Sequence, residues 1–133
     1  MTCTYEYIDN WLKVNLSPER YEHSLGTAEC ARELAERFGE NPEKAYFTGL
    51  IHDCAKCLPK DETLHIIKTF LNLEDGELCS PKTHHAPVGA YIAKKEFKID
   101  DEEILSAIRW HTIGKVNMTP FEKIIFLADK IET

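Results

Sequence analysis

The sequence contains no long apolar run. A membrane-spanning helix needs about 18 or more consecutive apolar residues, and no stretch of this chain approaches that length. The first residues, from Met1 to Trp11, are polar and acidic, and they lack the basic segment followed by an apolar run that defines a signal peptide. We therefore expect a cytoplasmic protein with no membrane partner.

Basic residues are also fewer than acidic residues. The 133 residues include 16 lysines and arginines against 23 aspartates and glutamates, which gives a formal net charge of -7. Binding to nucleic acid without sequence preference needs a basic surface, so we expect no nucleic-acid partner. If the ligand is an anion, something other than net charge must hold it, and a bound metal ion is the simplest candidate.

The cysteines do not form a pattern that indicates disulfides or structural zinc. Their number is odd, and they are scattered along the chain at Cys3, Cys30, Cys54, Cys57 and Cys79. Cys54 and Cys57 form a CxxC pair, but a structural zinc site needs a second pair, which the sequence lacks. We expect reduced thiols, in keeping with a cytoplasmic protein.

Strand-like alternation is missing over any useful length, whereas helical spacing of apolar residues recurs along most of the chain. We predict an all-α protein of one domain, residues 1–133, because this length is typical of a single domain. Gly39 is expected to end a helix, Asn41 to cap the next, and Thr119 with Glu122 to form a capping box. The predicted helices cover 4–14, 18–38, 42–55, 60–72, 87–96, 101–112 and 120 to near the end, with a polar loop at 73–84.

Three of these helices place a side chain of metal-ligand type on their apolar face. The stripes are His23-Thr27-Ala31-Leu34-Phe38, Ile104-Ile108-His111 and Phe121-Ile125-Asp129. A buried aspartate is costly unless it is paired or bound to a metal. One inward histidine is more often a satisfied core residue, but three such side chains from three helices indicate a metal site.

The adjacent pair His52-Asp53 follows an apolar run at 46–51. Neighbouring residues on a helix project about 100° apart, so both side chains can reach one ion from different directions. Asp53 can also bridge two ions with its two oxygens. Lys56 follows three residues later, close enough to reach the same pocket.

The order His23, His52-Asp53, Asp129 resembles the HD superfamily of phosphohydrolases, which is named for the adjacent His-Asp pair. From about residue 18 to the last residue, the chain is also similar to the bacterial YqeK family. The blocks that carry this resemblance are 20–24, 49–56, 85–90, 107–112 and 122–129. The resemblance implies an HD-domain helical bundle. It also implies an iron-using enzyme that splits diadenosine tetraphosphate symmetrically into two ADP, with a homodimer as the suggested assembly.

The resemblance assigns the metal ligands to His23, His52, Asp53 and Asp129. Imidazole and carboxylate ligands suit iron, manganese or zinc, and the site holds one or two ions. His85 and His111 either hold a second ion or contact phosphate. The expected catalytic residues are Asp53, Lys56, His85 and His111. The expected substrate-binding residues are Arg20, Asp53, Lys56, His85, His111, Thr112 and Asp129.

Alternatives remain open at this stage. The domain could be another HD phosphohydrolase, such as a nucleotidase or a cyclic-dinucleotide phosphodiesterase, or a nucleotide-binding sensor without catalysis. Arg109 either contacts phosphate or merely extends along the surface, and Glu132 either supports Asp129 or is a charged helix end. His84 is predicted to face solvent. Thr133 stands where the family has proline, so we expect the chain to lack the family's C-terminal segment.

Overall fold

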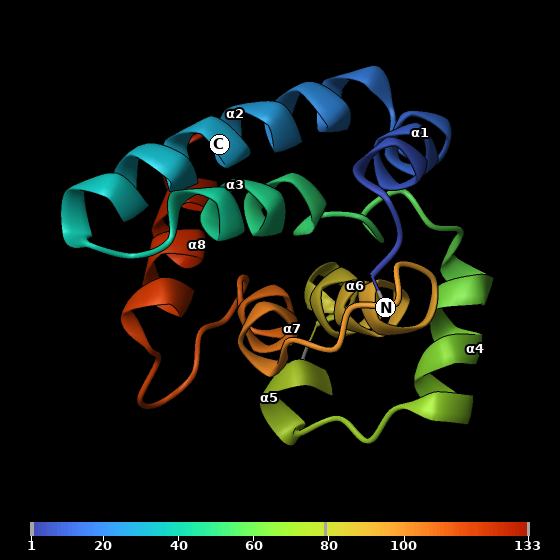
Figure 1. Cartoon of the computed structure of the whole chain (residues 1–133). Coiled ribbons are helices and arrows are strands. Elements are labelled where there is room, and N and C mark those ends of the chain that lie inside the picture. Colours follow the sequence, from blue (N-terminus) through green and yellow to red (C-terminus); the bar gives the residue numbers. More distant parts are fainter. Residues whose placement is uncertain (1, 79, 133) are drawn as a thin grey trace.

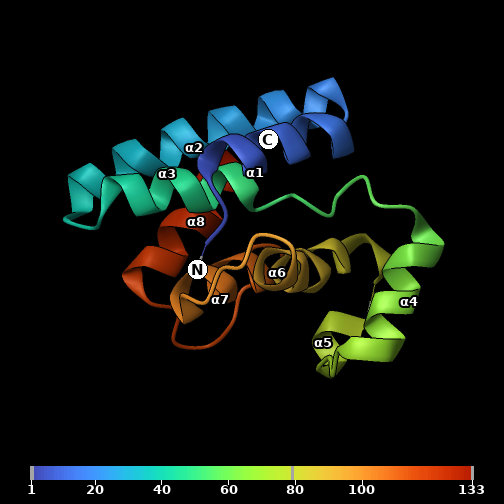
Figure 2. The ribbon, with the colours of Figure 1, turned by 45° about the vertical axis from the view of Figure 1, so that its right-hand side comes forward.

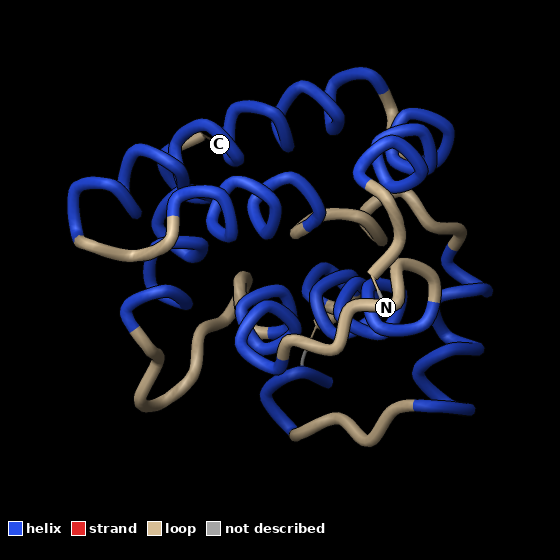
Figure 3. The backbone as a smooth tube through the Cα atoms, viewed as in Figure 1, coloured by secondary structure: helices blue, strands red, loops and turns tan. Residues whose placement is uncertain are grey.

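The computed structural model describes residues 2–78 and 80–132. Within these ranges the chain forms helices and loops and no strand, so the predicted all-α class is confirmed (Figures 1 and 3). Cys79 and Thr133 lie outside the described residues. The helices are α1 (Tyr5–Asn15), α2 (Pro18–Phe38), α3 (Pro42–Ile51), α4 (Lys60–Phe70), α5 (Asp75–Leu78), the short 3₁₀ helix η1 (Pro81–Thr83), α6 (His85–Lys95), α7 (Glu102–Arg109) and α8 (Pro120–Ile131).

The helices form two layers joined by α8. The antiparallel pair α2 and α3 lies with α1 on one side, α6 and α7 lie on the other, and α4 and α5 are set to one end (Figures 1 and 2). Helix α8 packs against α2, α3 and α7, so it touches both layers. Helix α8 therefore brings parts of the two layers together that lie far apart in sequence.

Local capping explains why α2 and α3 form a tight pair. Ser17 accepts a hydrogen bond from the Arg20 backbone, and Gly39 ends α2 in the left-handed region at φ 78°. Asn41 then caps α3 by accepting from the Lys44 backbone. The two helices approach closely at Gly49, where an added Cβ would lie 3.0 Å from the Cα of Ala28. This close approach holds the end of α3 against the middle of α2.

The predicted capping box at the start of α8 is confirmed. Thr119 accepts from the Glu122 backbone at 3.1 Å, and the Glu122 carboxylate accepts from the Thr119 backbone at 2.9 Å. The Glu122 side chain is buried, and it also accepts a hydrogen bond from Ser106 and pairs with Lys115 at 3.1 Å. The box therefore ties α8 to α7 as well as starting the helix.

Several predicted boundaries are wrong in detail. Helix α3 ends at Ile51 rather than about residue 55, because the chain turns through short-range bonds such as Lys56 N to Asp53 O at 2.9 Å. The predicted loop at 73–84 contains α5 and η1, and α6 begins at His85 rather than Pro87.

The predicted inward stripe on α2 does not extend to its last member, since Phe38 is 65% exposed. Fifteen residues separate His23 from Phe38, which at about 100° per residue rotates the stripe by about 60°. The last turn of α2 therefore leaves the core. Among the described helices, none is both long enough and apolar enough to cross a bilayer.

Candidate metal centre

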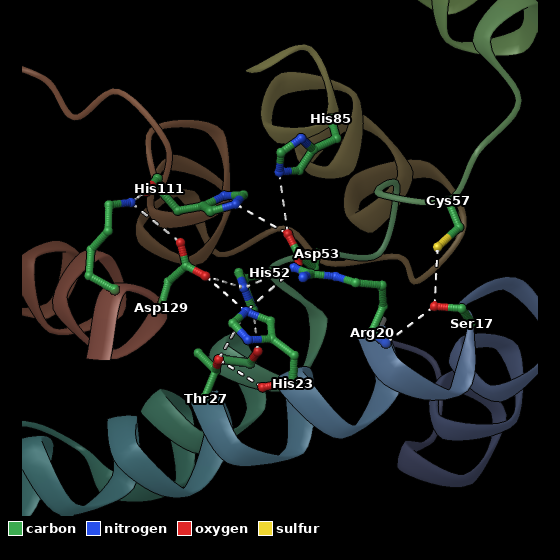
Figure 4. Close-up of polar contacts among 12 residues, drawn as sticks. Ser17, Arg20, His23, Thr27, His52, Asp53, Cys57, His85, His111 and Asp129 are labelled. Carbon is green, nitrogen blue, oxygen red and sulfur yellow. Dashed lines mark hydrogen bonds and ion pairs between the residues drawn. The ribbon is translucent and has the colours of Figure 1, made fainter. Parts of the chain in front are cut away.

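The ligand-type side chains predicted from the sequence meet in the space between the two layers (Figure 4). They come from α2, the turn after α3, the start of α6, the turn after α7 and the last turns of α8. In chain order they are His23, His52, Asp53, His85, His111 and Asp129, and the predicted phosphate contact Arg20 joins them from α2.

Asp53 lies at the centre of this cluster and is 1% exposed. Its Oδ2 faces the Nε2 atoms of His23 and His52 at 3.8 and 3.7 Å. Its Oδ1 faces the Nε2 atoms of His85 and His111 at 3.3 and 3.4 Å. The two oxygens of one carboxylate thus point to two different pairs of histidines, which is the arrangement of a bridging ligand.

Asp129 completes the first of these pairs. Its Oδ1 lies 2.9 Å from Nε2 of His23 and 3.2 Å from Nε2 of His52. Ligand atoms of His23, His52 and Asp129 all lie within 4.8 Å of one another, and the same holds for His52, Asp53 and His111. Two overlapping groups of potential ligands are therefore present.

Three of the histidines are oriented in the same way. The Nδ1 atom of His52 lies 2.6 Å from the carbonyl oxygen of Gly49, and that of His111 lies 2.7 Å from the carbonyl of Ile108. His85 repeats the arrangement with Lys82 at 3.1 Å. Each carbonyl belongs to the residue three positions earlier, in the last turn of a helix, where carbonyls lack their usual helical partner.

A carbonyl can only accept, so each of these Nδ1 atoms carries the proton and donates it. A metal ion bound in the cluster would meet the lone pair of Nε2, whereas in its absence Nε2 can carry a proton and donate it to Asp53 or Asp129. Such a hydrogen bond from Nδ1 is how proteins fix the orientation of histidine ligands to metals. Sequence reasoning missed these backbone acceptors, although a histidine one or two residues after the end of a helix is a signal that could have found them.

The electrostatics of the cluster favour two ionised carboxylates. Burial opposes ionisation of Asp53, but His52, His111 and His85 offset it and hold the pKa of this carboxyl far below its usual range. Burial likewise opposes the charge on Asp129, and His52 and His111 keep its pKa low. Burial lowers the pKa of His111, and the hydrogen bond to Asp53 offsets this only in part.

The donor set fits a transition metal. Neutral imidazole nitrogens and carboxylate oxygens suit iron, manganese and zinc rather than calcium, which prefers oxygen alone. Two ionised carboxylates in a largely buried space also call for a compensating cation.

The predicted phosphate-contacting residues take different positions around the centre. The Arg20 guanidinium donates to Oδ2 of Asp53, so Arg20 reaches the cluster. Lys56 is exposed and lines a pocket beside His85, and Thr112 is half-buried in the turn directly after His111.

The structure also shows the contacts of Arg109 and Glu132, for which the sequence left two interpretations each. The Arg109 guanidinium donates to both oxygens of Glu77, at 2.6 and 2.8 Å. The Glu132 carboxylate lies against Gly26 of α2. His84, predicted to face solvent, is half-buried, and its Nε2 is enclosed without a hydrogen-bond partner in the described part of the chain.

Sequence comparison decides the family. The profile of the HD domain matches residues 20–133. The chain belongs to the HD domain family. The family's adjacent histidine and aspartate are His52 and Asp53, the pair at the centre of the cluster.

Relatives within the HD family extend this result. The chain is 45% identical over 124 residues to a protein of Bacillus subtilis named symmetrical bis(5'-nucleosyl)-tetraphosphatase, and 42% identical over 121 residues to one of the same name from Halalkalibacterium halodurans. Each match covers 91% of this chain and 65% of the relative. The chain therefore spans slightly less than two thirds of the length of these relatives.

A solved HD structure is similar over nearly the whole chain. The crystal structure of a predicted HD superfamily hydrolase involved in NAD metabolism, from Clostridium acetobutylicum, aligns with a TM-score of 0.92 at 41% identity. The alignment covers 99% of this chain and 70% of that one. A second HD superfamily hydrolase, from an uncultured Thermotogales bacterium, has a TM-score of 0.63 at 21% identity and shares the fold.

Proposed function

We propose that this protein is a metal-dependent hydrolase that cleaves dinucleoside tetraphosphates symmetrically, so that diadenosine tetraphosphate yields two ADP. The observation that carries the proposal is the position of Asp53, with one oxygen facing His23 and His52 and the other facing His85 and His111. The similarity to two proteins named for this reaction gives the substrate class. The four described cysteines, all free, support a cytoplasmic location.

We assign one ion to His23, His52, Asp53 and Asp129, and a second to Asp53, His85 and His111. Iron is the ion we propose, and manganese or zinc would suit the same donors. Two divalent ions against the charges of Asp53 and Asp129 would leave the site with a formal charge of about +2. That local charge would attract a polyphosphate to a protein whose net charge is -7.

A divalent ion bound in this centre would lower the pKa of a coordinated water towards neutrality and polarise phosphoryl oxygens. Asp53, at the middle of the cluster, is placed to orient the attacking water and to accept its proton. Asp129 holds His23 and His52 in position from the opposite side of the centre.

The polar and cationic side chains around the centre would bind the phosphates of the substrate. Arg20 lies at the rim beside Asp53, and its planar guanidinium can bind two phosphate oxygens at once. Lys56 offers a point charge one turn beyond Asp53, and Thr112 offers a hydroxyl. In a centre with a single ion, His85 or His111 would instead supply the proton to the departing diphosphate.

The test is an anaerobic assay of the purified chain, loaded with ferrous iron, against diadenosine tetraphosphate, with the products separated by ion exchange. ADP as the sole nucleotide product is the expected result. AMP together with ATP would contradict symmetrical cleavage. Turnover of deoxynucleoside monophosphates or cyclic dinucleotides instead would favour another HD phosphohydrolase, and nucleotide binding without turnover of any of these would favour a sensor.

A further inference from the structure

A pocket of about 370 Å³ opens beside the metal centre, between the turn after α3, the start of α4 and the segment that leads into α6. This volume falls at the lower end of the range of small-molecule sites, about 300 to 1,000 Å³. The lining residues are Ala55, Lys56, Leu58, Lys60, Thr63, Leu64, Pro81, Lys82, His84 and His85. We refer to these residues as the lysine pocket.

The charge of the lysine pocket is opposite to that of the protein. Lys56, Lys60 and Lys82 line it, and no aspartate or glutamate is among its described lining residues, although the chain carries a net charge of -7. Lys60 belongs to α4, and the acidic side chains of this helix, Asp61 and Glu62, border a separate groove. Helix α4 thus turns Lys60, Thr63 and Leu64 to the pocket and Asp61 and Glu62 to another side, which suits an anionic ligand.

His84 also lines the pocket and is half-buried, so part of its imidazole can lie beside a ligand there.

His85 connects the pocket to the metal centre. It lines the pocket, and its Nε2 lies 3.3 Å from Oδ1 of Asp53. Its Nδ1 donates to the carbonyl of Lys82, which is itself a pocket residue. A phosphate chain that reaches the centre past His85 would therefore continue directly among the lysines.

We infer that the lysine pocket binds the nucleoside diphosphate that leaves, an inference that rests on the proposed function. Water attacks one of the two inner phosphorus atoms of the tetraphosphate. The bond from that phosphorus to the central bridging oxygen, which joins the two inner phosphorus atoms, breaks. The bond's electron pair stays on the leaving diphosphate as negative charge, and Asp53 takes the proton of the attacking water. Lys60 and Lys82 bind the phosphates of the leaving diphosphate, and Leu58, Leu64 and Pro81 pack against its nucleoside.

A second pocket provides a matched control. It has a volume of about 450 Å³ and is lined by Lys94, Lys95 and Arg109, together with the stacked rings of Phe70 and Tyr91. None of the side chains in the metal cluster is among its described lining residues. Neutralising Lys94 and Lys95 therefore removes two positive charges, as does neutralising Lys60 and Lys82. Unlike the lysine pocket, however, this second pocket shares no described lining residue with the metal cluster.

The experiment compares the metal-loaded wild type with the double variants Lys60→Gln/Lys82→Gln and Lys94→Gln/Lys95→Gln. The pocket variant should raise KM for diadenosine tetraphosphate and Kd for ADP roughly tenfold, since each lost charged hydrogen bond weakens binding, while kcat changes far less. The control variant should match the wild type. Bound metal and thermal unfolding are measured for all three, to exclude loss of the centre or of the fold.

Calorimetric binding of ADP separates this inference from the proposed function. If the wild type does not cleave diadenosine tetraphosphate, the proposed function fails. Even then, a roughly tenfold weaker ADP affinity confined to the pocket variant would support the lysine pocket as a nucleoside-diphosphate site. Equal ADP affinity in the wild type and the pocket variant, or a loss that appears in the control variant instead, would overturn the inference.

Discussion

The Nδ1 atom of His52 lies 2.6 Å from the carbonyl oxygen of Gly49, three residues earlier in the chain. Because the carbonyl can only accept, Nδ1 of His52 donates to it, and Nε2 is the atom that would bind the proposed metal ion. Gly49 is also a point of close approach between α3 and α2, where an added Cβ would lie 3.0 Å from the Cα of Ala28. One glycine thus takes part both in the helix packing and in the orientation of a proposed metal ligand.

Replacement of Gly49 by alanine should therefore affect stability and metal binding together. The new methyl group would meet backbone atoms of Ala28 and Thr27 at 3.0 to 3.2 Å, which cannot move aside without a shift of α2. We expect a loss of about 1–3 kcal/mol in the free energy of unfolding, the usual cost of overpacking a core. Denaturant unfolding and iron titration measure the two effects.

The control for that substitution is Gly76→Ala. A Cβ at Gly76 would meet only Cδ1 of Ile113, at an ordinary contact distance of 3.8 Å. This variant should retain wild-type stability to within about 0.5–1 kcal/mol and should bind iron normally. Equal stability and iron affinity for Gly49→Ala and Gly76→Ala would contradict the role given to the α2–α3 contact.

Asp53→Ala should abolish turnover and remove metal from the centre, because Asp53 faces both pairs of histidines. We expect a fall in kcat of about 10³-fold or more, the scale seen when a group that acts at the reacting atoms is lost. Activity, iron content and circular dichroism are measured on the same preparation. Asp100→Ala, an exposed aspartate between α6 and α7, is the matched control. Wild-type turnover by a folded Asp53→Ala protein would rule out the metal assignment.

The proposal of two ions can be tested by counting them. His85 and His111 both face Oδ1 of Asp53, so His111→Ala should lower the iron content from about two ions to about one per chain. His65→Ala, on the exposed surface of α4, should leave the content unchanged. Elemental analysis after removal of free iron gives the stoichiometry. A wild-type protein that holds a single ion would refute the second assignment.

The ion pair of Glu77 with Arg109 predicts a pH dependence of stability. Glu77 is 2% exposed, and although burial opposes its charge, Arg109 lowers the pKa of this carboxyl from its ordinary value of 4.5. A lowered pKa in the folded state means that the contribution to stability is complete above pH 4.5. It is lost progressively as the pH falls below that value through the folded-state pKa.

Glu77→Gln should therefore lower the free energy of unfolding by about 2 kcal/mol at pH 7, the scale of a hydrogen-bonded pair with a charged partner. The difference from the wild type should shrink as the pH is lowered below 4.5. Denaturant unfolding across that range measures it, with Asp75→Asn on the same short helix as an exposed control. A difference that stays constant with pH would argue against an ionised Glu77 in the fold.

Features that depend on neighbouring residues could be predicted from the sequence. Gly39 ends α2, Asn41 caps α3, and Thr119 with Glu122 starts α8, because each of these hydrogen bonds joins residues a few positions apart. Helical spacing also placed His23 and Asp129 on inward faces. In the structure, Nε2 of His23 lies 2.9 Å from Oδ1 of Asp129. The boundaries failed where the chain turns tightly, as at the end of α3 after Ile51.

By itself, the sequence determined the helical class and the capping of the main helices, because spacing and residue type carry that information locally. The set of residues that meet at the centre followed from the resemblance to the HD family. Only the tertiary structure decided which oxygen of Asp53 faces which histidines, that Arg109 pairs with Glu77, and that His84 is half-buried beside the lysine pocket. These contacts depend on how helices far apart in sequence pack, and no local pattern specifies the distance or direction between two such side chains.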